Sequence, residues 1–247
     1  PNVSEGRDAA VLGAVADAIR AVPGVRPLDM DSDPDHHRTV YTFVGPPKAA
    51  AEGAFACVAE AVKRIDLRAH AGEHPRHGAA DVVPFVPLQG ITLEECGALA
   101  RRFAKRVETE LKVPAALYGA ACPDGTELPA LRRRKGSAHP TAGRVAVGAR
   151  DVLIAFNVQI EGSDLAAAKA IAKEMRALPA VRALAFALKS RSCVQVSMNL
   201  LDWRRTSPLQ AFKAVSEQAE ARGFTVRDSE VVGMAPREAL EADFARA

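Results

Sequence analysis

Apolar and polar positions along the second half of the chain follow two periods that alternate with each other. Continuous or alternating apolar runs are typical of strands, and apolar residues three and four positions apart are typical of helices. Strands are expected at 151–160, 181–189, 192–202 and 225–234, and helices at 163–178, 208–222 and from 236 onwards. The resulting order, βαββαβ with a helical tail, is the split βαβ or ferredoxin-like arrangement.

The first half shows the same periods in an order that lacks one strand. Helices are expected at 7–22, 47–65 and 92–112, and strands at 25–31, 38–45, 81–88 and 113–118. Thr92, followed three residues later by Glu95, has the spacing of a capping box at the start of the third helix. One more strand at the N-terminus would complete a second βαββαβ unit, although residues 2–6 read as a polar turn. Because the sequence opens on Pro1 and not on Met, we expect the natural protein to begin several residues earlier and the first strand to be truncated.

Two sheets that each carry helices on one face would leave their other faces to meet. A crevice between two such subdomains is a natural ligand site. Residues 119–144 show neither period and are the best linker candidate, and they contain the basic run Arg132-Arg-Arg-Lys135. A charge run is usually a solvated face. The predicted class is α+β.

Composition narrows the classes of function. A formal net charge of +3 at pH 7 argues against general nucleic-acid binding, although it permits a local basic pocket for an acidic small molecule. The four cysteines form no CxxC pair, so we expect free thiols in a reducing, cytoplasmic compartment and no zinc site. No apolar run approaches the length needed to span a membrane.

One polar stretch, His70-Ala-Gly-Glu-His-Pro-Arg-His-Gly78, concentrates titratable side chains between a predicted helix and a predicted strand. Its glycines and its proline prevent either element from continuing, so it is a loop held between two rigid elements. His74 lies between Glu73 and Arg76, a setting suited to proton exchange near neutral pH. The alternative for any single histidine is a surface side chain that hydrogen-bonds to backbone.

Metal binding by this loop is not expected. His70, His74 and His77 have spacings that resemble pairs of metal ligands on a helix. Gly72 and Pro75 break the helix that would place those side chains on one face.

Four aspartates, at 29, 31, 33 and 35, alternate along a strand end and the turn that follows. Alternation places Asp29 and Asp31 on the same face of the strand. Asp33 and Asp35 fit capping positions of a solvated turn. An acid at the end of a central strand could orient a histidine, as a carboxylate does in a catalytic triad.

Two amides and three guanidinium groups are further candidates. Asn157 and Asn199 interrupt otherwise apolar strands, and Arg38, Arg76 and Arg150 are plausible anchors for carboxylates. An amide in a strand is more often a satisfied structural group, and a single arginine is more often a surface charge. Both amides could instead face the crevice.

Longer motifs extend over nearly the whole chain. They are Pro1-Asn-Val-Ser-Glu-Gly6, Asp29-Met-Asp31, Arg38-Thr-Val-Tyr-Thr-Phe-Val-Gly-Pro-Pro47, Gly72-Glu-His-Pro-Arg76, Asp81-Val-Val-Pro-Phe-Val-Pro87, Val113-Pro-Ala-Ala-Leu-Tyr-Gly119, His139-Pro-Thr-Ala-Gly143, Val147-Gly-Ala-Arg150, Leu153-Ile-Ala-Phe-Asn157 and Gln195-Val-Ser-Met-Asn-Leu-Leu-Asp202. Together they resemble the formiminotransferase domain family, known as glutamate formimidoyltransferase, alone or fused to a cyclodeaminase.

The resemblance implies a reaction and a set of site residues. The reaction transfers the formimino group from N-formimino-L-glutamate to the 5-nitrogen of tetrahydrofolate, with release of glutamate, in histidine breakdown. The implied fold has two ferredoxin-like (βαββαβ) subdomains, residues 1–150 and 151–247, with the folate in a tunnel between their sheets, usually in a homodimer. The catalytic acid/base falls on His74 and its helper on Asp31. Folate contacts fall on His139, Pro140, Thr141, Ala142 and Gly143, and we place substrate contacts at Asn2, Arg38, Arg76, Arg150, Asn157 and Asn199.

The sequence departs from the family pattern in one place. Members usually carry a longer segment before the His139-Pro-Thr-Ala-Gly143 stretch, with GEYE-like and PDFGP-like motifs, and neither occurs between Arg132 and Ala138. Part of the folate-side wall is therefore expected to be missing or rebuilt, and the Arg132–Lys135 run could grip the glutamate tail of folate instead. Three alternatives stay open: a non-catalytic or weakly folate-binding paralogue that keeps the formiminoglutamate pocket, a formyl-transferring variant, and a purely structural βαββαβ module.

Overall fold

The computed structural model describes residues 1–70, 77–134, 136–188 and 190–244. Residues 242–244 are described by their backbone alone. The chain forms two compact units, Pro1–Asp151 and Val152–Ala247. Each unit has its own sheet, its own helices and its own apolar core. The Gly72–Arg76 motif lies outside the described residues, so the structure is informative about the two ends of its loop.

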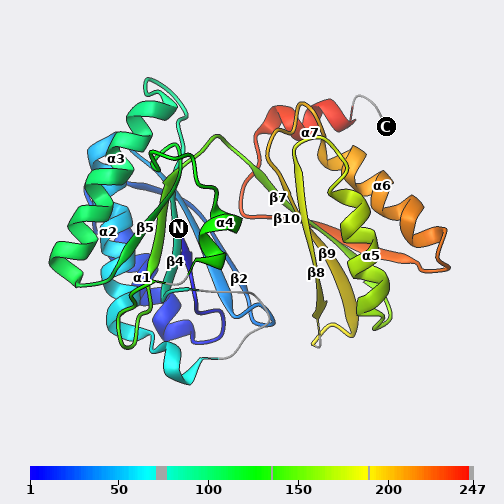
Figure 1. The fold of residues 1–247 in the computed structure, drawn as a ribbon, viewed down its shortest axis with the longest axis horizontal. Coiled ribbons are helices and arrows are strands. Elements are labelled where there is room, and N and C mark those ends of the chain that lie inside the picture. The colour runs from blue at the N-terminus through cyan, green and yellow to red at the C-terminus, as the bar shows by residue number, and fades with distance from the viewer. Residues whose placement is uncertain (71–76, 135, 189, 245–247) are drawn as a thin grey trace. The chain divides into compact units, whose positions relative to one another are not determined.

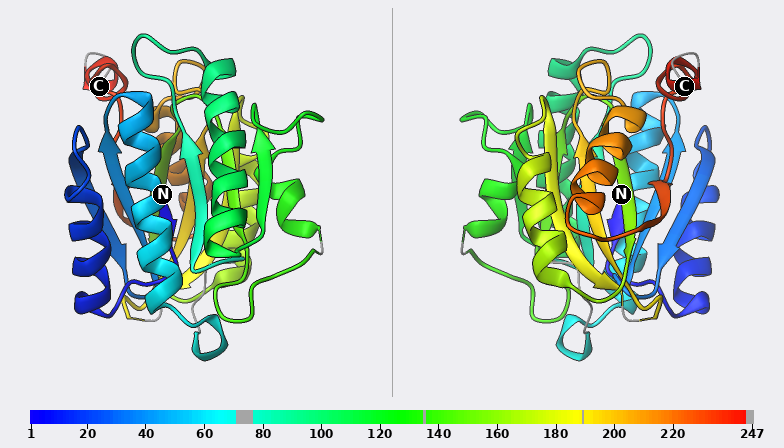
Figure 2. Two further views of the ribbon diagram at one scale, coloured as in Figure 1. Left: turned by 90° about the vertical axis from the view of Figure 1, so that its left-hand side faces the viewer. Right: turned by 90° about the vertical axis from the view of Figure 1, so that its right-hand side faces the viewer.

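The second unit contains four strands and three helices among its described residues (Figure 1). These are β7 (Ile154–Glu161), α5 (Leu165–Met175), β8 (Val181–Leu188), β9 (Cys193–Leu200), α6 (Pro208–Glu220), β10 (Val226–Val232) and α7 (Arg237–Phe244). The strands form one antiparallel sheet in the order β10-β7-β9-β8. Helices α5 and α6 lie on one face of this sheet (Figure 2, right). This is the predicted ferredoxin-like βαββαβ unit.

The first unit contains a similar unit with an extension. Its elements are β1 (Asn2–Val3), α1 (Ala9–Arg20), β2 (Arg26–Asp33), β3 (Arg38–Val44), α2 (Pro47–Arg64), β4 (Ala80–Phe85), α3 (Leu93–Arg106), β5 (Ala115–Gly119), α4 (Leu128–Arg133) and β6 (Val145–Ala149). The sheet order is β2-β3-β1-β4-β6-β5. The first four strands are antiparallel and make the ferredoxin-like part, and β6 and β5 extend it in parallel.

Two predictions about the first unit were wrong, and one strand was missed. Residues 2–6 were expected to be a polar turn, but Asn2 and Val3 form a strand between β3 and β4. Residues 119–144 were expected to be a linker, but they hold α4, and strand β6 directly after them was not predicted. In each case the element depends on contacts with segments distant in sequence, which periodicity does not reveal. The capping box of Thr92 and Glu95 at α3 is confirmed.

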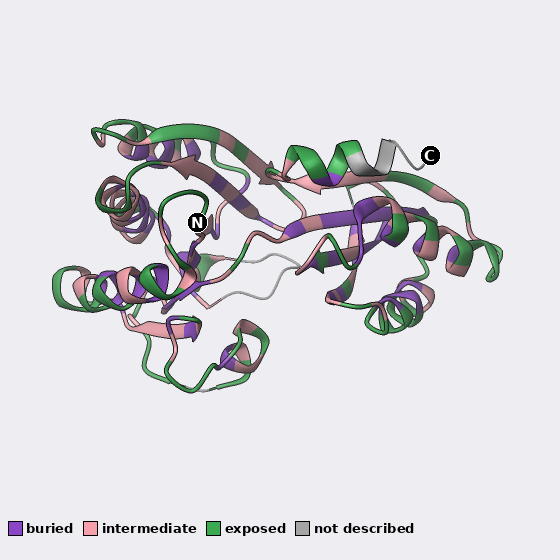
Figure 3. Ribbon diagram, turned by 90° about the horizontal axis from the view of Figure 1, so that it is seen from above, coloured by how far each residue is buried: buried purple, intermediate pink, exposed green. Residues whose placement is uncertain are grey.

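Alternation along the central strands separates the two faces of the first sheet. Val83 and Val147 point to the core beneath α1, α2 and α3, which lie side by side on that face (Figure 2, left). Val82 and Ala146 point to the opposite face, where they pack against α4. Buried residues line the strands and the helix sides that face them (Figure 3).

The α+β class with two ferredoxin-like units is therefore confirmed. The tunnel between the sheets stays a prediction. In the described part of the chain, no helix combines the length and the apolar character needed to cross a bilayer.

Candidate active site

The face of the first sheet that is free of α1, α2 and α3 carries three of the candidate residues. Asn2 of β1 and Asp31 of β2 both pair with Val40 of β3, from its two sides. Residues directly opposite in a sheet point to the same face, so the two side chains flank Val40 on one surface. Arg38 lies two residues before Val40 on the same face, and its Nε donates a hydrogen bond of 3.0 Å to Asn2 Oδ1. The structure thus brings together an acid, an amide and a guanidinium.

Arg150 lies near the same group. It directly follows β6, and its charge, like that of Arg38, acts on the amino group of Pro1. Burial lowers the pKa of Arg150, while the neighbouring Tyr118 opposes that effect. Burial raises the pKa of Tyr118 to about 12, so the phenol stays neutral. Two guanidinium groups therefore approach one end of the sheet, an arrangement suited to anionic ligands.

The N-terminal end of the loop that carries Gly72–Arg76 rests on a buried histidine. The ring of His70 stacks on the ring of His37, with centroids 3.9 Å apart and planes at 24°. Nδ1 of His37 lies 3.1 Å from the Gly6 N–H and 3.2 Å from Glu5 Oε1. When neutral, this nitrogen can accept from Gly6; when protonated, it can donate to Glu5. Sequence reasoning missed this pair, because His37 reads as part of a solvated turn.

The carboxylate of Glu5 accepts several backbone hydrogen bonds at this end of the loop. Its Oε1 accepts from the backbone N–H groups of Gly6, Arg7 and Asp8 at 2.8, 2.8 and 3.1 Å. Burial alone would raise the pKa of this carboxyl, but the three donors and His37 outweigh burial and hold the pKa below its usual value. The ionised form is thus favoured by the fold.

We expect Glu5→Gln to lower the free energy of unfolding by about 1–3 kcal/mol at pH 7, since the amide oxygen can still accept these hydrogen bonds but lacks the charge that strengthens them. A carboxyl whose pKa is lowered by folding stabilises above its unfolded pKa and loses that contribution as pH falls through the folded value. The difference from wild type should therefore be constant near neutrality and shrink below about pH 4.5. Urea unfolding between pH 7 and pH 4 measures this, with the exposed Glu217→Gln as control. A difference that does not change with pH would contradict the assignment.

The C-terminal end of the loop is held by the His139–Gly143 segment, which was expected to contact folate. His139 Nδ1 accepts from the Ala142 N–H at 3.1 Å and, more weakly, from the Thr141 N–H at 3.3 Å. The carbonyl of Ala142 accepts from the Ala79 N–H, and that of Thr141 from the Leu67 N–H, at 2.9 and 2.8 Å. This turn therefore hydrogen-bonds to the segments before and after the loop, a structural role that the motif did not predict.

Gly143 is required at its position for two reasons. Its φ of +67° lies in the left-handed region, and a Cβ there would lie 2.1 Å from the carbonyl oxygen of His77. We expect Gly143→Ala to lower the free energy of unfolding by about 3 kcal/mol, near the upper end of single substitutions. Gly13, within α1, has open space around its Cβ position, so Gly13→Ala should instead stabilise by about 0.5–1 kcal/mol. Thermal or urea unfolding measures the change in the free energy of unfolding for each variant. The same change in Gly143→Ala and Gly13→Ala would contradict the requirement for glycine at position 143.

In the second unit, Asn157 and Asn199 point away from the helix-packed core. Their neighbours Phe156, Val158, Met198 and Leu200 belong to that core, and alternation sends the amides to the other face. Asn157 is buried and its Nδ2 donates to Glu230 Oε1 at 3.0 Å, whereas Asn199 is exposed. Contact of either amide with a ligand stays a prediction.

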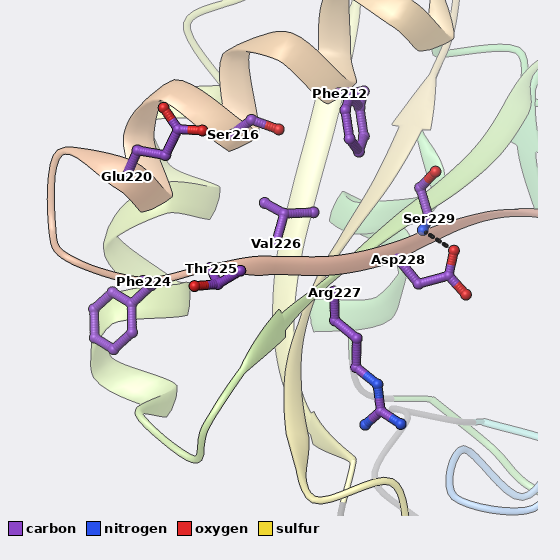
Figure 4. A pocket seen from close by; sticks show the side chains of 9 residues that line it. All are labelled: Phe212, Ser216, Glu220, Phe224, Thr225, Val226, Arg227, Asp228 and Ser229. Carbon is purple, nitrogen blue, oxygen red and sulfur yellow. Dashed lines mark hydrogen bonds between the residues drawn. The ribbon is translucent and has the colours of Figure 1, made fainter.

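A groove of about 620 Å³ lies elsewhere on the second unit, between α6 and the edge strand β10 (Figure 4). Its lining includes Phe212, Ser216 and Asp228, and the carboxylate of Asp228 accepts from the Ser229 N–H at 2.7 Å. The lining residues include neither histidine nor cysteine.

Two candidates, His74 and Arg76, lie outside the described residues. In the part of the chain that the structure describes, no three His, Cys, Asp or Glu side chains gather as ligands for a metal ion. The remaining candidates of the first unit gather at the open sheet face and at the two ends of the loop. This arrangement can hold carboxylates beside a loop that bears a histidine.

Comparison with known proteins gives a family. Residues 1–146 match the profile "Formiminotransferase domain, N-terminal subdomain", and residues 150–245 match "Formiminotransferase domain". The chain is 42% identical to glutamate formimidoyltransferase of Thermoplasma acidophilum, over 97% of the chain and 88% of that protein. It is 37% identical to glutamate formimidoyltransferase of Streptococcus pyogenes, over 97% and 89%. It is also 36% identical to formimidoyltransferase-cyclodeaminase of Rattus norvegicus, over 97% of the chain and 50% of that protein.

The alignments with these relatives extend over 265 to 271 positions, more than the 247 residues of the chain. The relatives therefore contain residues that this chain lacks within the aligned region. The shortened segment expected before His139 stays a prediction.

Proposed function

The chain belongs to the formiminotransferase domain family, and on that premise we propose that it acts as a glutamate formimidoyltransferase. It transfers the formimino group of N-formimino-L-glutamate to the 5-nitrogen of tetrahydrofolate, in the breakdown of histidine. The supporting observation is that Asn2, Asp31 and Arg38 share one sheet face. They belong to the unit in which both ends of the Gly72–Arg76 loop are fixed.

The reaction requires a group that moves a proton in both directions. The folate nitrogen attacks the amidine carbon, and a tetrahedral centre forms. The attacking nitrogen then loses its proton, and the glutamate nitrogen gains one as its bond to that carbon breaks. An imidazole with a pKa near the working pH can do both, and we assign this role to His74.

Carboxylates on both substrates provide the remaining recognition. Arg38, positioned by Asn2, and the half-buried Arg150 are assigned to the carboxylates of formiminoglutamate, together with Arg76. Asp31 is assigned to orient His74 and to favour its charged form. In the second unit, Asn157 and Asn199 are assigned substrate contacts from the helix-free face of their sheet.

The folate side is the weaker end of the proposed site. We assign folate contacts to the His139–Gly143 turn, whose backbone already holds the loop. The segment expected to be shortened lies directly before this turn, and each methylene that is no longer buried against the folate would weaken apolar burial by roughly 0.8 kcal/mol. Weak folate binding is thus the second candidate.

We also propose that the protein acts as a cytoplasmic homodimer. Support for the compartment comes from four free cysteines, three of them buried. Support for the dimer comes from the family resemblance. Light scattering during size exclusion measures the mass in solution, and a mass near the 26.2 kDa of one chain would contradict the dimer.

An assay of glutamate release tests the proposed function. Release should require both formiminoglutamate and tetrahydrofolate, and 5-formiminotetrahydrofolate should appear in equal amount. N-formylglutamate, tested in parallel, should react far more slowly if the formimino group is the true cargo. Release without folate, or preference for the formyl donor, would contradict the proposal.

A further inference from the structure

Asp81 occupies an irregular position in β4, directly after the loop. Asn2 and Val3 are adjacent on β1 but pair with Val82 and Ala80, so Asp81 is the extra residue of a bulge. Bulges redirect a side chain and are frequent beside active sites. The side chain of Asp81 is only 2% exposed.

Both oxygens of this buried carboxylate are engaged. Oδ1 accepts a hydrogen bond of 2.7 Å from the backbone N–H of His77. Oδ2 lies 2.5 Å from Nη2 of Arg132, whose side chain is 18% exposed. Burial of a carboxylate is costly unless it is paired and hydrogen-bonded, so Arg132 supplies the ion pair that lets Asp81 hold the exit of the loop.

The position of Arg132 is itself fixed by apolar packing. Leu128 and Leu131 attach α4 to Val82 and Ala146 on the open face of the first sheet. The short helix thus carries its guanidinium to the bulge in β4. This use of Arg132 competes with the expected grip of the Arg132–Lys135 run on a folate tail.

His77 is held on its other side as well. Its carbonyl accepts from the Arg144 N–H at 2.9 Å. Burial, Arg132 and Arg144 lower the pKa of the His77 imidazole, and Asp81 opposes them. The His77 backbone is therefore fixed by two hydrogen bonds, and its side chain is kept neutral near pH 7.

We propose that Arg132 is a positioning residue for the transfer reaction: through Asp81 it fixes the backbone of His77, and with it the exit of the loop that bears His74. This inference rests on the proposed function. A misplacement of about 1 Å at a reacting group can cost about 10²-fold in rate. Arg132 touches neither substrate in this account, so its effect appears in turnover and not in substrate affinity.

The test compares Arg132→Gln and Asp81→Asn with Arg102→Gln, a control on an exposed arginine of α3 that the account assigns to no ligand. All are assayed well below their unfolding temperatures. Arg132→Gln and Asp81→Asn should each lower kcat by about 10²-fold, with little change in KM for formiminoglutamate. The double variant should be no slower than the single ones, because both act through one contact. Arg132→Lys, which keeps a cation for Oδ2, should recover most of kcat.

Hydrogen exchange of the His77 amide provides a readout that does not require activity. It should exchange faster in Arg132→Gln than in Arg102→Gln. Wild-type kcat in Arg132→Gln, with unchanged exchange at His77, would overturn the positioning role. A lowered unfolding temperature with wild-type kcat would also overturn it, since that result marks a purely structural pair. Absence of formimino transfer in the wild-type protein would instead overturn the proposed function.

Discussion

Replacement of His74→Asn is expected to lower turnover by roughly two to four orders of magnitude, the usual contribution of a positioned general acid/base. Asparagine is close in size to histidine and can hydrogen-bond, but it cannot exchange a proton near neutral pH. One group would otherwise both remove a proton from the folate nitrogen and give one to the departing glutamate nitrogen. Its loss therefore slows both halves of the transfer.

Steady-state kinetics with both substrates saturating measures this effect. The unfolding temperature of His74→Asn should equal that of wild type, which excludes loss of fold. His139→Asn is a useful comparison, because the His139 ring holds a backbone turn. The His139→Asn variant should show a clearly lower free energy of unfolding, while its turnover number changes less than that of His74→Asn. Turnover of His74→Asn within a few-fold of wild type would falsify the acid/base assignment.

The second large effect is expected at Arg38. A charge-assisted hydrogen bond to a carboxylate contributes about 1.5–3 kcal/mol, so Arg38→Gln should raise KM for formiminoglutamate by roughly 10- to 100-fold at 1.4 kcal/mol per tenfold. The hydrogen bond from Arg38 Nε to Asn2 Oδ1 fixes the direction of the guanidinium. An arginine already held in place loses less conformational entropy when it binds a substrate.

Arg26→Gln is the matched control, because Arg26 lies on the same sheet but is exposed at the start of the edge strand β2. It should leave both KM values unchanged. If Arg38→Gln raises KM for tetrahydrofolate and leaves KM for formiminoglutamate unchanged, the guanidinium serves the other substrate. In that case the assignment of this sheet face to formiminoglutamate is wrong.

Periodicity predicted most of the second unit, since its strands are long and their alternation is regular. It failed in the first unit where an element is short and its support is distant. β1 has only two residues, Asn2 and Val3, and no period can be read from two positions. α4 is a six-residue helix that depends on the packing of Leu128 and Leu131 on a sheet that other segments build.

The candidate site shows the same limit. Alternation placed Asp31 on a definite face of its strand, and the structure places Arg38 and Asn2 on that face with it. The partnership of Glu5 with His37 was not predicted, because the two residues are distant in sequence and His37 sits among turn residues. The Asp81–Arg132 pair was missed for a related reason, since a basic run is usually solvated.

Resemblance supplied what periodicity could not, namely the roles of individual residues. Its prediction for His139–Gly143 shows how a motif can have a second task. Two of the five residues that were assigned to folate, Thr141 and Ala142, accept backbone hydrogen bonds from Leu67 and Ala79, which lie before and after the Gly72–Arg76 loop. A variant in this turn therefore reports on the loop as well as on the cofactor.

Transfer of an isotopic label tests the central claim most directly. Formiminoglutamate with ¹³C in the formimino carbon is mixed with tetrahydrofolate and the wild-type protein, and the products are followed by mass spectrometry and NMR. The account predicts that the label appears on the 5-nitrogen of tetrahydrofolate in equal amount to the glutamate released, and that His74→Asn slows both to the same extent. Label that stays on the donor, or that is released to solvent while the folate remains unlabelled, would contradict it.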